Sequence, residues 1–196
     1  MKRIFLALAA LMTLSAAAQL DRSIRPTPAE PRVPTIAPYR QFTMKNGMTV
    51  LVVEDHKLPR VSIGLSMDPG QLFEGDIAGV SALTGDMLSE GTTLRDKASL
   101  DEAVDYIGAR LRTGPTGVNT SGLSKYADQL FSIAAEVATK PAFPEASFEK
   151  LKNQLITGLK NERDNPGTIR GNVSRALLYG TNHPAGELVT EATVNH

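Results

Sequence analysis

Apolar and polar residues alternate with a period of two in the first part of the folded chain, and this pattern predicts strands. The alternation is clearest over residues 61–67, and a turn at 68–70 closes it. Before it, Asn46-Gly47 separates the apolar segments 42–44 and 48–54. This dipeptide is typical of a β-hairpin, because both turn positions tolerate a positive φ. We therefore expect a hairpin followed by a further strand.

From residue 77 onward the apolar period lengthens to between three and four residues, which predicts helices. A short Gly/Thr-rich stretch predicts one more hairpin around 114–117, and a Ser99–Glu102 capping box predicts a helix start. The expected helices cover about 77–90, 99–107, 124–139, 145–163 and 168–179. Strands followed by a helix-rich second half predict an α+β fold, with an antiparallel-rich sheet covered by helices on one face.

The N-terminus has the layout of a secretory signal peptide. Lys2 and Arg3 precede an apolar run from Ile4 to Leu14, and small residues lead to a cleavage site after Ala18. The run is shorter than the roughly 20 residues of a membrane-spanning helix, so we expect no stable membrane anchor. A Pro-rich linker is predicted at 19–38. The expected location is therefore secreted, in a bacterial periplasm or outside the cell, by way of a cleaved signal peptide at 1–18.

Composition excludes several classes of function. The chain has 21 basic and 21 acidic residues, no cysteine and three histidines. Zero net charge and sparse aromatic residues argue against a nucleic-acid partner. Without cysteine there is no disulfide, thiolate zinc site, iron–sulfur cluster or cysteine nucleophile. No Gly-x-Ser-x-Gly elbow is present, so a serine nucleophile has no support either.

Four segments resemble the insulinase/pitrilysin-like (M16) peptidases in order and approximate spacing. They lie at 45–55, 79–92, 141–144 and 163–166, so the resemblance covers the chain from Phe42 to the C-terminus. It implies an M16 metallopeptidase-like, N-terminal α+β domain at 39–196. Family members carry such domains in pairs, and their active subunits are zinc endopeptidases. The family unit is about twice as long, so we expect a fragment or a truncated product.

The zinc motif of the family is absent from the corresponding helix. Active members carry His-x-x-Glu-His, in which two histidines bind zinc and the glutamate polarises water. The positions that correspond here are Ala82, Gly85 and Asp86, and the region of the third ligand, 156–159, contains no acid. One carboxylate cannot replace three protein ligands. We therefore expect no catalytic residue, no bound metal and no cofactor in this chain, with zinc held by an active partner.

The resemblance implies a secreted non-catalytic subunit that forms a hetero-oligomer with a zinc-bearing M16 homologue and helps to bind unfolded peptides. An exposed sheet edge can hold a peptide by backbone hydrogen bonds, and we consider the strand at 61–67 and the segment 118–123 as such edges. The expected peptide-binding residues are Val61, Ile63, Leu65, Val118, Asn119 and Ser121. Two alternatives stay open: a stand-alone peptide-binding module, and a residual metallopeptidase with an unrecognised site.

Overall fold

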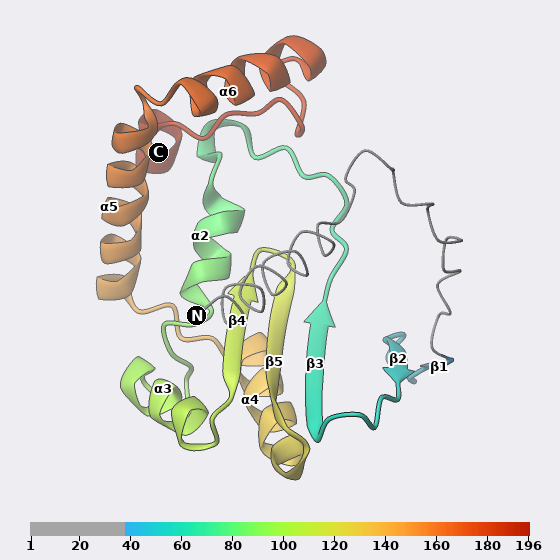
Figure 1. Cartoon of the computed structure of the whole chain (residues 1–196). Helices are drawn as coiled ribbons and strands as arrows, with labels where there is room; N and C mark the ends of the chain where they lie inside the picture. Colours follow the sequence, from blue (N-terminus) through green and yellow to red (C-terminus); the bar gives the residue numbers. More distant parts are fainter. Residues whose placement is uncertain (1–37) are drawn as a thin grey trace, which may run out of the picture. The chain divides into compact units, whose positions relative to one another are not determined.

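The computed structural model describes residues 38–196, and the chain divides into two compact units at the Glu54–Asp55 boundary (Figure 1). The predicted signal peptide and all but the last residue of the predicted linker lie outside the described residues. None of the helices at 38–196 has the length and apolar character that a membrane crossing requires.

The described part of the first unit is the hairpin predicted at Asn46-Gly47. Strands β1 (Tyr39–Thr43) and β2 (Thr49–Val53) pair antiparallel, with Phe42 opposite Val50. In the turn, Gly47 has a φ of 86°, and the Asn46 side chain accepts a hydrogen bond from the Met48 backbone N–H at 3.1 Å. Gly47 thus adopts the positive φ for which the dipeptide predicts a hairpin, whereas Asn46 contributes its side-chain hydrogen bond and has no positive φ.

The second unit is built on a three-stranded antiparallel sheet of β3 (Arg60–Ser66), β4 (Arg110–Gly114) and β5 (Gly117–Leu123). Its strand order is β3-β5-β4, so β5 is paired on both sides and Thr120 faces both Ile63 and Leu111. The hairpin predicted around 114–117 is confirmed. The expectation that 118–123 forms an exposed edge is wrong, because both neighbours of β5 use its backbone groups. In this sheet β3 is an edge strand, as expected.

The five predicted helices are present, with differences of up to three residues at their boundaries. Asp96 rather than Ser99 caps its helix, because the Asp96 carboxylate accepts a hydrogen bond from the Ser99 N–H at 2.9 Å. A last short helix was not predicted; Thr190 and Thr193 form a capping box at its start. The helical elements are η1 (Gly75–Ile77), α2 (Val80–Met87), α3 (Lys97–Tyr106), η2 (Ser124–Tyr126), α4 (Ala127–Thr139), α5 (Glu145–Glu162), α6 (Pro166–Tyr179) and α7 (Glu191–Asn195).

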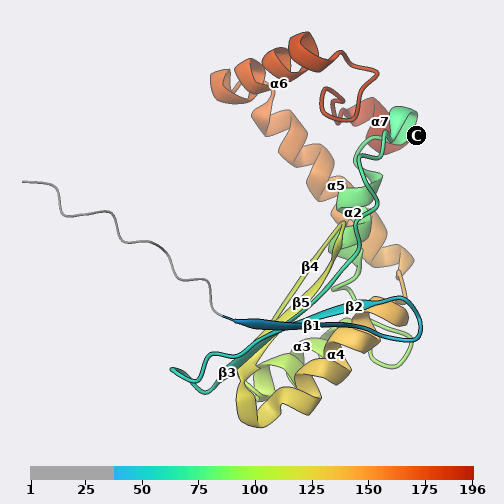
Figure 2. The same ribbon diagram turned by 90° about the vertical axis from the view of Figure 1, so that its right-hand side faces the viewer.

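The core of the second unit lies between the sheet and helices α3 and α4, which lie on the same side of it (Figure 2). Leu130 of α4 is fully buried, and its carbonyl accepts a hydrogen bond from the Thr120 hydroxyl of β5 at 3.2 Å. The buried apolar residues of this core are Ile63, Leu100, Val104, Ile107, Val118, Leu130, Ile133, Ala134 and Val137. The α+β fold with helices on one face of the sheet is confirmed.

Truncation of Leu130 should strongly destabilise the second unit. Leu130→Ala removes a side chain with no exposed surface, so we expect a loss of about 2–5 kcal/mol in the free energy of unfolding, measured by urea titration. The matched control is Leu177→Ala on α6, where the side chain is 81% exposed and the loss should stay below about 0.5 kcal/mol. Equal losses in the two variants would contradict this location of the core.

Candidate functional site

Helix α2 carries the three positions predicted to correspond to the zinc motif. Glu74 fixes the first turn of this helix. The Glu74 carboxylate accepts hydrogen bonds from the backbone N–H groups of Gly79, at 2.5 Å, and Ser81, at 2.9 Å. These N–H groups have no acceptor within the helix, so the carboxylate satisfies its open end. Burial alone raises the pKa of Glu74, but hydrogen bonds from Ser81, Gly79 and Val80 outweigh it and lower the pKa below its ordinary value.

The segment that follows α6 holds the residues before α2. The Glu187 carboxylate accepts hydrogen bonds from the backbone N–H groups of Glu74, at 3.2 Å, and Gly75, at 2.5 Å. On α7, the Thr193 hydroxyl donates to the Ala78 carbonyl at 2.9 Å. Residues 74–79 are therefore anchored by a segment more than a hundred positions further along the chain.

The three motif positions have different surroundings. Ala82 and Asp86, one turn apart, are exposed, whereas Gly85 is buried. A Cβ atom on Gly85 would collide with the backbone of Gly114 and Pro115 in the β4–β5 turn. The glycine is thus required by the close approach of this turn to α2. The position predicted for the family's glutamate therefore has no room for a side chain.

Helix α5, which we expected to contain the position of the third zinc ligand, presents apolar side chains to α2. A small cavity of about 120 Å³ between them is lined by Val80 and Leu83 of α2 and by Phe148 and Leu155 of α5, among others. In the expected ligand region, Ile156 and Leu159 are half-buried and Thr157 and Gly158 are exposed. This side of α5 supplies packing to α2 and no carboxylate.

Zinc does not fit the residues at these positions. Ala82 offers a methyl group, Gly85 offers no side chain, and only Asp86 carries a ligand atom. Within residues 38–196, no group of three or more His, Cys, Asp or Glu side chains is arranged to hold a metal ion. Of the histidines, His183 stacks on the Tyr179 ring at 5.7 Å, and its Nδ1 accepts the Ala185 N–H at 3.1 Å in a turn.

The residues predicted to bind peptide lie on both faces of the sheet. Ile63 and Val118 are buried in the core, and Val61 and Leu65 pack against it. Asn119 and Ser121 are half-buried on the opposite face, because successive side chains of a strand alternate between faces. A peptide paired with the free edge of β3 would contact the backbone of Val61, Ile63 and Leu65, whereas Val118 lies on the central strand. Side-chain contact with a peptide is open to Asn119 and Ser121.

We did not predict from the sequence the basic hollow that lies beside these two residues. A hollow of about 520 Å³ contains Asn119 and Ser121, and basic side chains surround it. Its lining residues are Asp55, Lys57, Leu58, Arg60, Val61, Ser62, Arg110, Arg112, Asn119 and Ser121. The alternation Arg110-x-Arg112 was a visible signal of a basic strand face, but its neighbour Arg60 comes close only through the pairing of β3, β5 and β4.

A partly buried ion pair joins the loop after α2 to α4. The Glu136 carboxylate accepts hydrogen bonds from the Arg95 guanidinium, at 2.5 and 3.2 Å, and from the Thr92 hydroxyl at 2.6 Å. Its side chain is only 8% exposed. Burial alone raises the pKa of Glu136, but the Arg95 and Thr92 hydrogen bonds and the charges of Arg95 and Lys140 lower it below its ordinary value.

The comparisons with known proteins identify the family. The family model described as insulinase (peptidase family M16) matches residues 49–184, and the chain belongs to this family. A crystal structure of a peptidase M16 inactive domain from Pseudomonas fluorescens is similar, with a TM-score of 0.70 and 27% sequence identity. The match covers 79% of this chain and 39% of the Pseudomonas chain, so this chain spans well under half of that protein. A search of the curated proteins found no match.

Two helical glycines should respond in opposite ways to alanine. Gly85→Ala puts a methyl group against the β4–β5 turn, and we expect it to cost about 1–3 kcal/mol of stability. Gly158→Ala in α5 meets no atom within 4 Å, and we expect it to stabilise the protein by about 0.5–1 kcal/mol. Urea unfolding of both variants measures the contrast, and a neutral or stabilising Gly85→Ala would disprove the close approach.

The Arg95–Glu136 ion pair should make the stability of the protein depend on pH. Because folding lowers the pKa of Glu136, its contribution is present above the ordinary value of 4.5 and is lost as pH falls through the folded-state value. We expect Tm, followed from about pH 7 to about pH 3, to fall less steeply in Glu136→Gln than in the wild type. The control, Glu162→Gln, changes an exposed carboxylate of α5 and should keep the wild-type slope.

Proposed function

We propose that this chain is a secreted, non-catalytic subunit of an M16-type zinc peptidase, which supports a catalytically competent homologous partner and contributes to peptide binding. The observation that carries the proposal is the packing of α2. The position of the family's glutamate is a glycine pressed against a hairpin turn, and Ala82 and Asp86 cannot complete a zinc site. A peptidase reaction would need its metal from another subunit.

The exposed face of α6 supports a subunit role. Ile169, Val173 and Leu177 follow one another at successive turns and are 47%, 51% and 81% exposed. No residue of α6 is buried within the described part of the chain. A continuous apolar stripe of this kind is typical of a surface that packs against another polypeptide.

The direct test is reconstitution of peptide cleavage. The mature chain is assayed with a fluorogenic peptide alone, and then with an M16 homologue from the same genome that carries His-x-x-Glu-His. We expect no cleavage and no stoichiometric zinc for the chain alone, and faster cleavage by the mixture than by the homologue. Cleavage by the chain itself, sensitive to a chelator, would instead support a residual metallopeptidase. A monomer with no effect on the homologue would support a stand-alone binding module.

A charged residue within the apolar stripe of α6 should weaken the association of the chain with the homologue. We expect Val173→Glu to weaken binding to the homologue by about tenfold or more, measured by light scattering on mixed samples. Arg170→Glu is the matched control, because it places the same carboxylate on the same helix outside the stripe and should bind nearly as the wild type does. Equal weakening by both variants would contradict a role for the apolar stripe.

A further inference from the structure

We propose that the outer face of the β3-β5-β4 sheet binds an extended acidic peptide segment through Arg60, Arg110 and Arg112. The inference deepens the proposed function, on which it rests for the idea that peptides are the ligands. It adds the chemical class of peptide and the side chains that select it.

Sheet geometry places the three arginines on one face. Strand β5 pairs with β4 so that Arg110 lies opposite Ser121 and Arg112 opposite Asn119. It pairs with β3 so that the same Ser121 lies opposite Ser62. Directly opposed residues share a face, and Arg60 lies two positions before Ser62 on the same face. The face therefore has guanidinium groups on both outer strands, with hydroxyl and amide side chains between them.

The interior of this face is hydrogen-bonded but leaves the cations free. Asn119 donates a hydrogen bond from its Nδ2 to the Ser62 hydroxyl at 3.3 Å, which orders the centre of the face. Among residues 38–196, no ion pair engages Arg60, Arg110 or Arg112, and all three are exposed. A guanidinium can bind a carboxylate with two parallel hydrogen bonds, so these groups retain their capacity for an acidic ligand.

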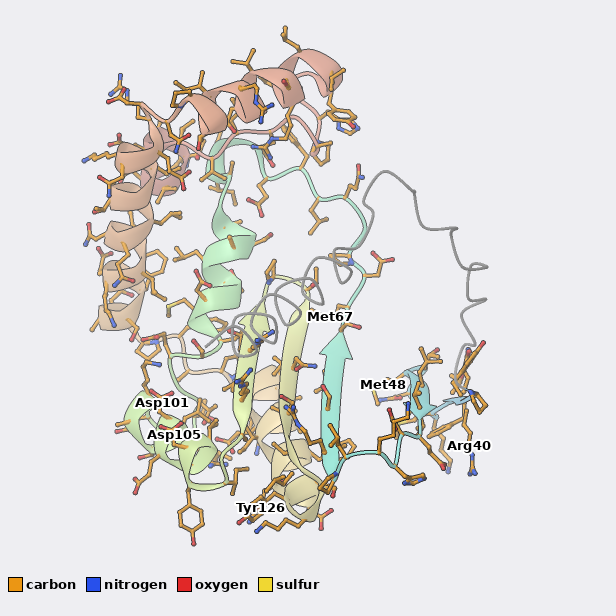
Figure 3. All side chains as sticks on the ribbon, viewed as in Figure 1. Arg40, Met48, Met67, Asp101, Asp105 and Tyr126 are labelled. Carbon is orange, nitrogen blue, oxygen red and sulfur yellow. The ribbon has the colours of Figure 1, made fainter. Side chains whose placement is uncertain are left out.

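The acidic residues near the face are few. Asp55 lines the same hollow as the arginines, and Lys57 beside it offsets its charge. On the side of β4, Asp101 and Asp105 project from α3 (Figure 3). Lys97 already pairs with Asp101 at 3.2 Å. Asp105 is therefore the carboxylate whose negative charge bounds the positive surface on this side.

The spacing of the cations fits an extended peptide. Arg110 and Arg112 are two residues apart on a strand, which corresponds to about 7 Å. Side chains at alternate positions of an extended peptide repeat at the same distance, so acidic residues at positions i and i+2 would match the two arginines. Ser62, Asn119 and Ser121 can donate to and accept from the peptide backbone between them.

A peptide fits this face better than a nucleic acid does. None of the residues that line the hollow is aromatic, so bases would find no stacking platform. The net charge of the chain is zero, which gives little long-range attraction for a polyanion. The local positive charge therefore suits a short acidic segment.

The test is binding of a labelled peptide of alternating Glu and Ser, about eight residues long, to the mature chain by fluorescence anisotropy. A peptide with Gln in place of Glu is the control ligand. We expect the Glu peptide to bind at least about tenfold more tightly, and the difference to shrink as salt is raised. Equal binding of the two peptides would overturn the proposal. So would preferential binding of a single-stranded DNA oligonucleotide of equal charge that displaces the peptide.

Variants locate the binding on this face. Arg110→Gln/Arg112→Gln should weaken the binding of the Glu peptide by about tenfold, and Asp55→Asn should strengthen it. Arg163→Gln/Arg170→Gln removes the same charge from exposed positions outside the sheet and should bind as the wild type does. Thermal unfolding of each variant confirms that it is folded. Equal weakening by the two double variants would show a non-specific charge effect and would overturn the assignment.

The outcome is separable from that of the proposed function. Reconstitution is measured with the wild-type chain and a neutral fluorogenic peptide, which has no carboxylate for the arginines to bind. If enhancement occurs but the Glu peptide is not preferred, the acidic specificity is wrong and the subunit role stands. If the Glu peptide binds and no homologue is enhanced, the binding face stands and the subunit role is wrong.

Discussion

The close approach of α2 to the β4–β5 turn at Gly85 is the contact on which the architecture of the second unit depends. On one side of α2 is the sheet with its core of α3 and α4, and on the other is α5, which packs against α2 through Phe148 and Leu155. A helix can lie this near to a backbone turn only where it has no side chain. Gly85 is also the position that the sequence predicts for the glutamate of an active M16 peptidase. At this position a side chain would collide with the turn.

Local patterns predicted most of the fold. Asn46-Gly47 and the turn at 114–117 each form a hairpin between neighbouring strands, and the period of the apolar residues located the five longer helices. These signals act over a few residues, so the sequence carries them directly. The start of α3 was displaced because Asp96 and Ser99 are both good capping residues, and only the backbone geometry shows that Asp96 accepts the hydrogen bond.

Long-range pairing explains what the sequence did not reveal. The residues of β5 carry no local signal that the strand pairs on both sides, and we had considered it as an edge. The same pairing gathers Arg60 and Arg110 from strands fifty residues apart, so the basic face could not be seen in the order of residues. The motif positions could be aligned with those of a known family, but the packing at Gly85 needed coordinates.

The anchoring of α2 by the C-terminal segment has a consequence for synthesis. Glu187 binds the backbone of Glu74 across 113 positions, and Thr193 binds Ala78 across 115. During synthesis, the residues of α2 leave the ribosome long before Glu187 and Thr193 have been added to the chain. The sheet core, which ends at α4, can form earlier because its strands and helices are complete by residue 139. The nascent chain would thus mature in two stages, and the residues just before α2 gain their anchors from Glu187 and Thr193 only when residue 193 has emerged.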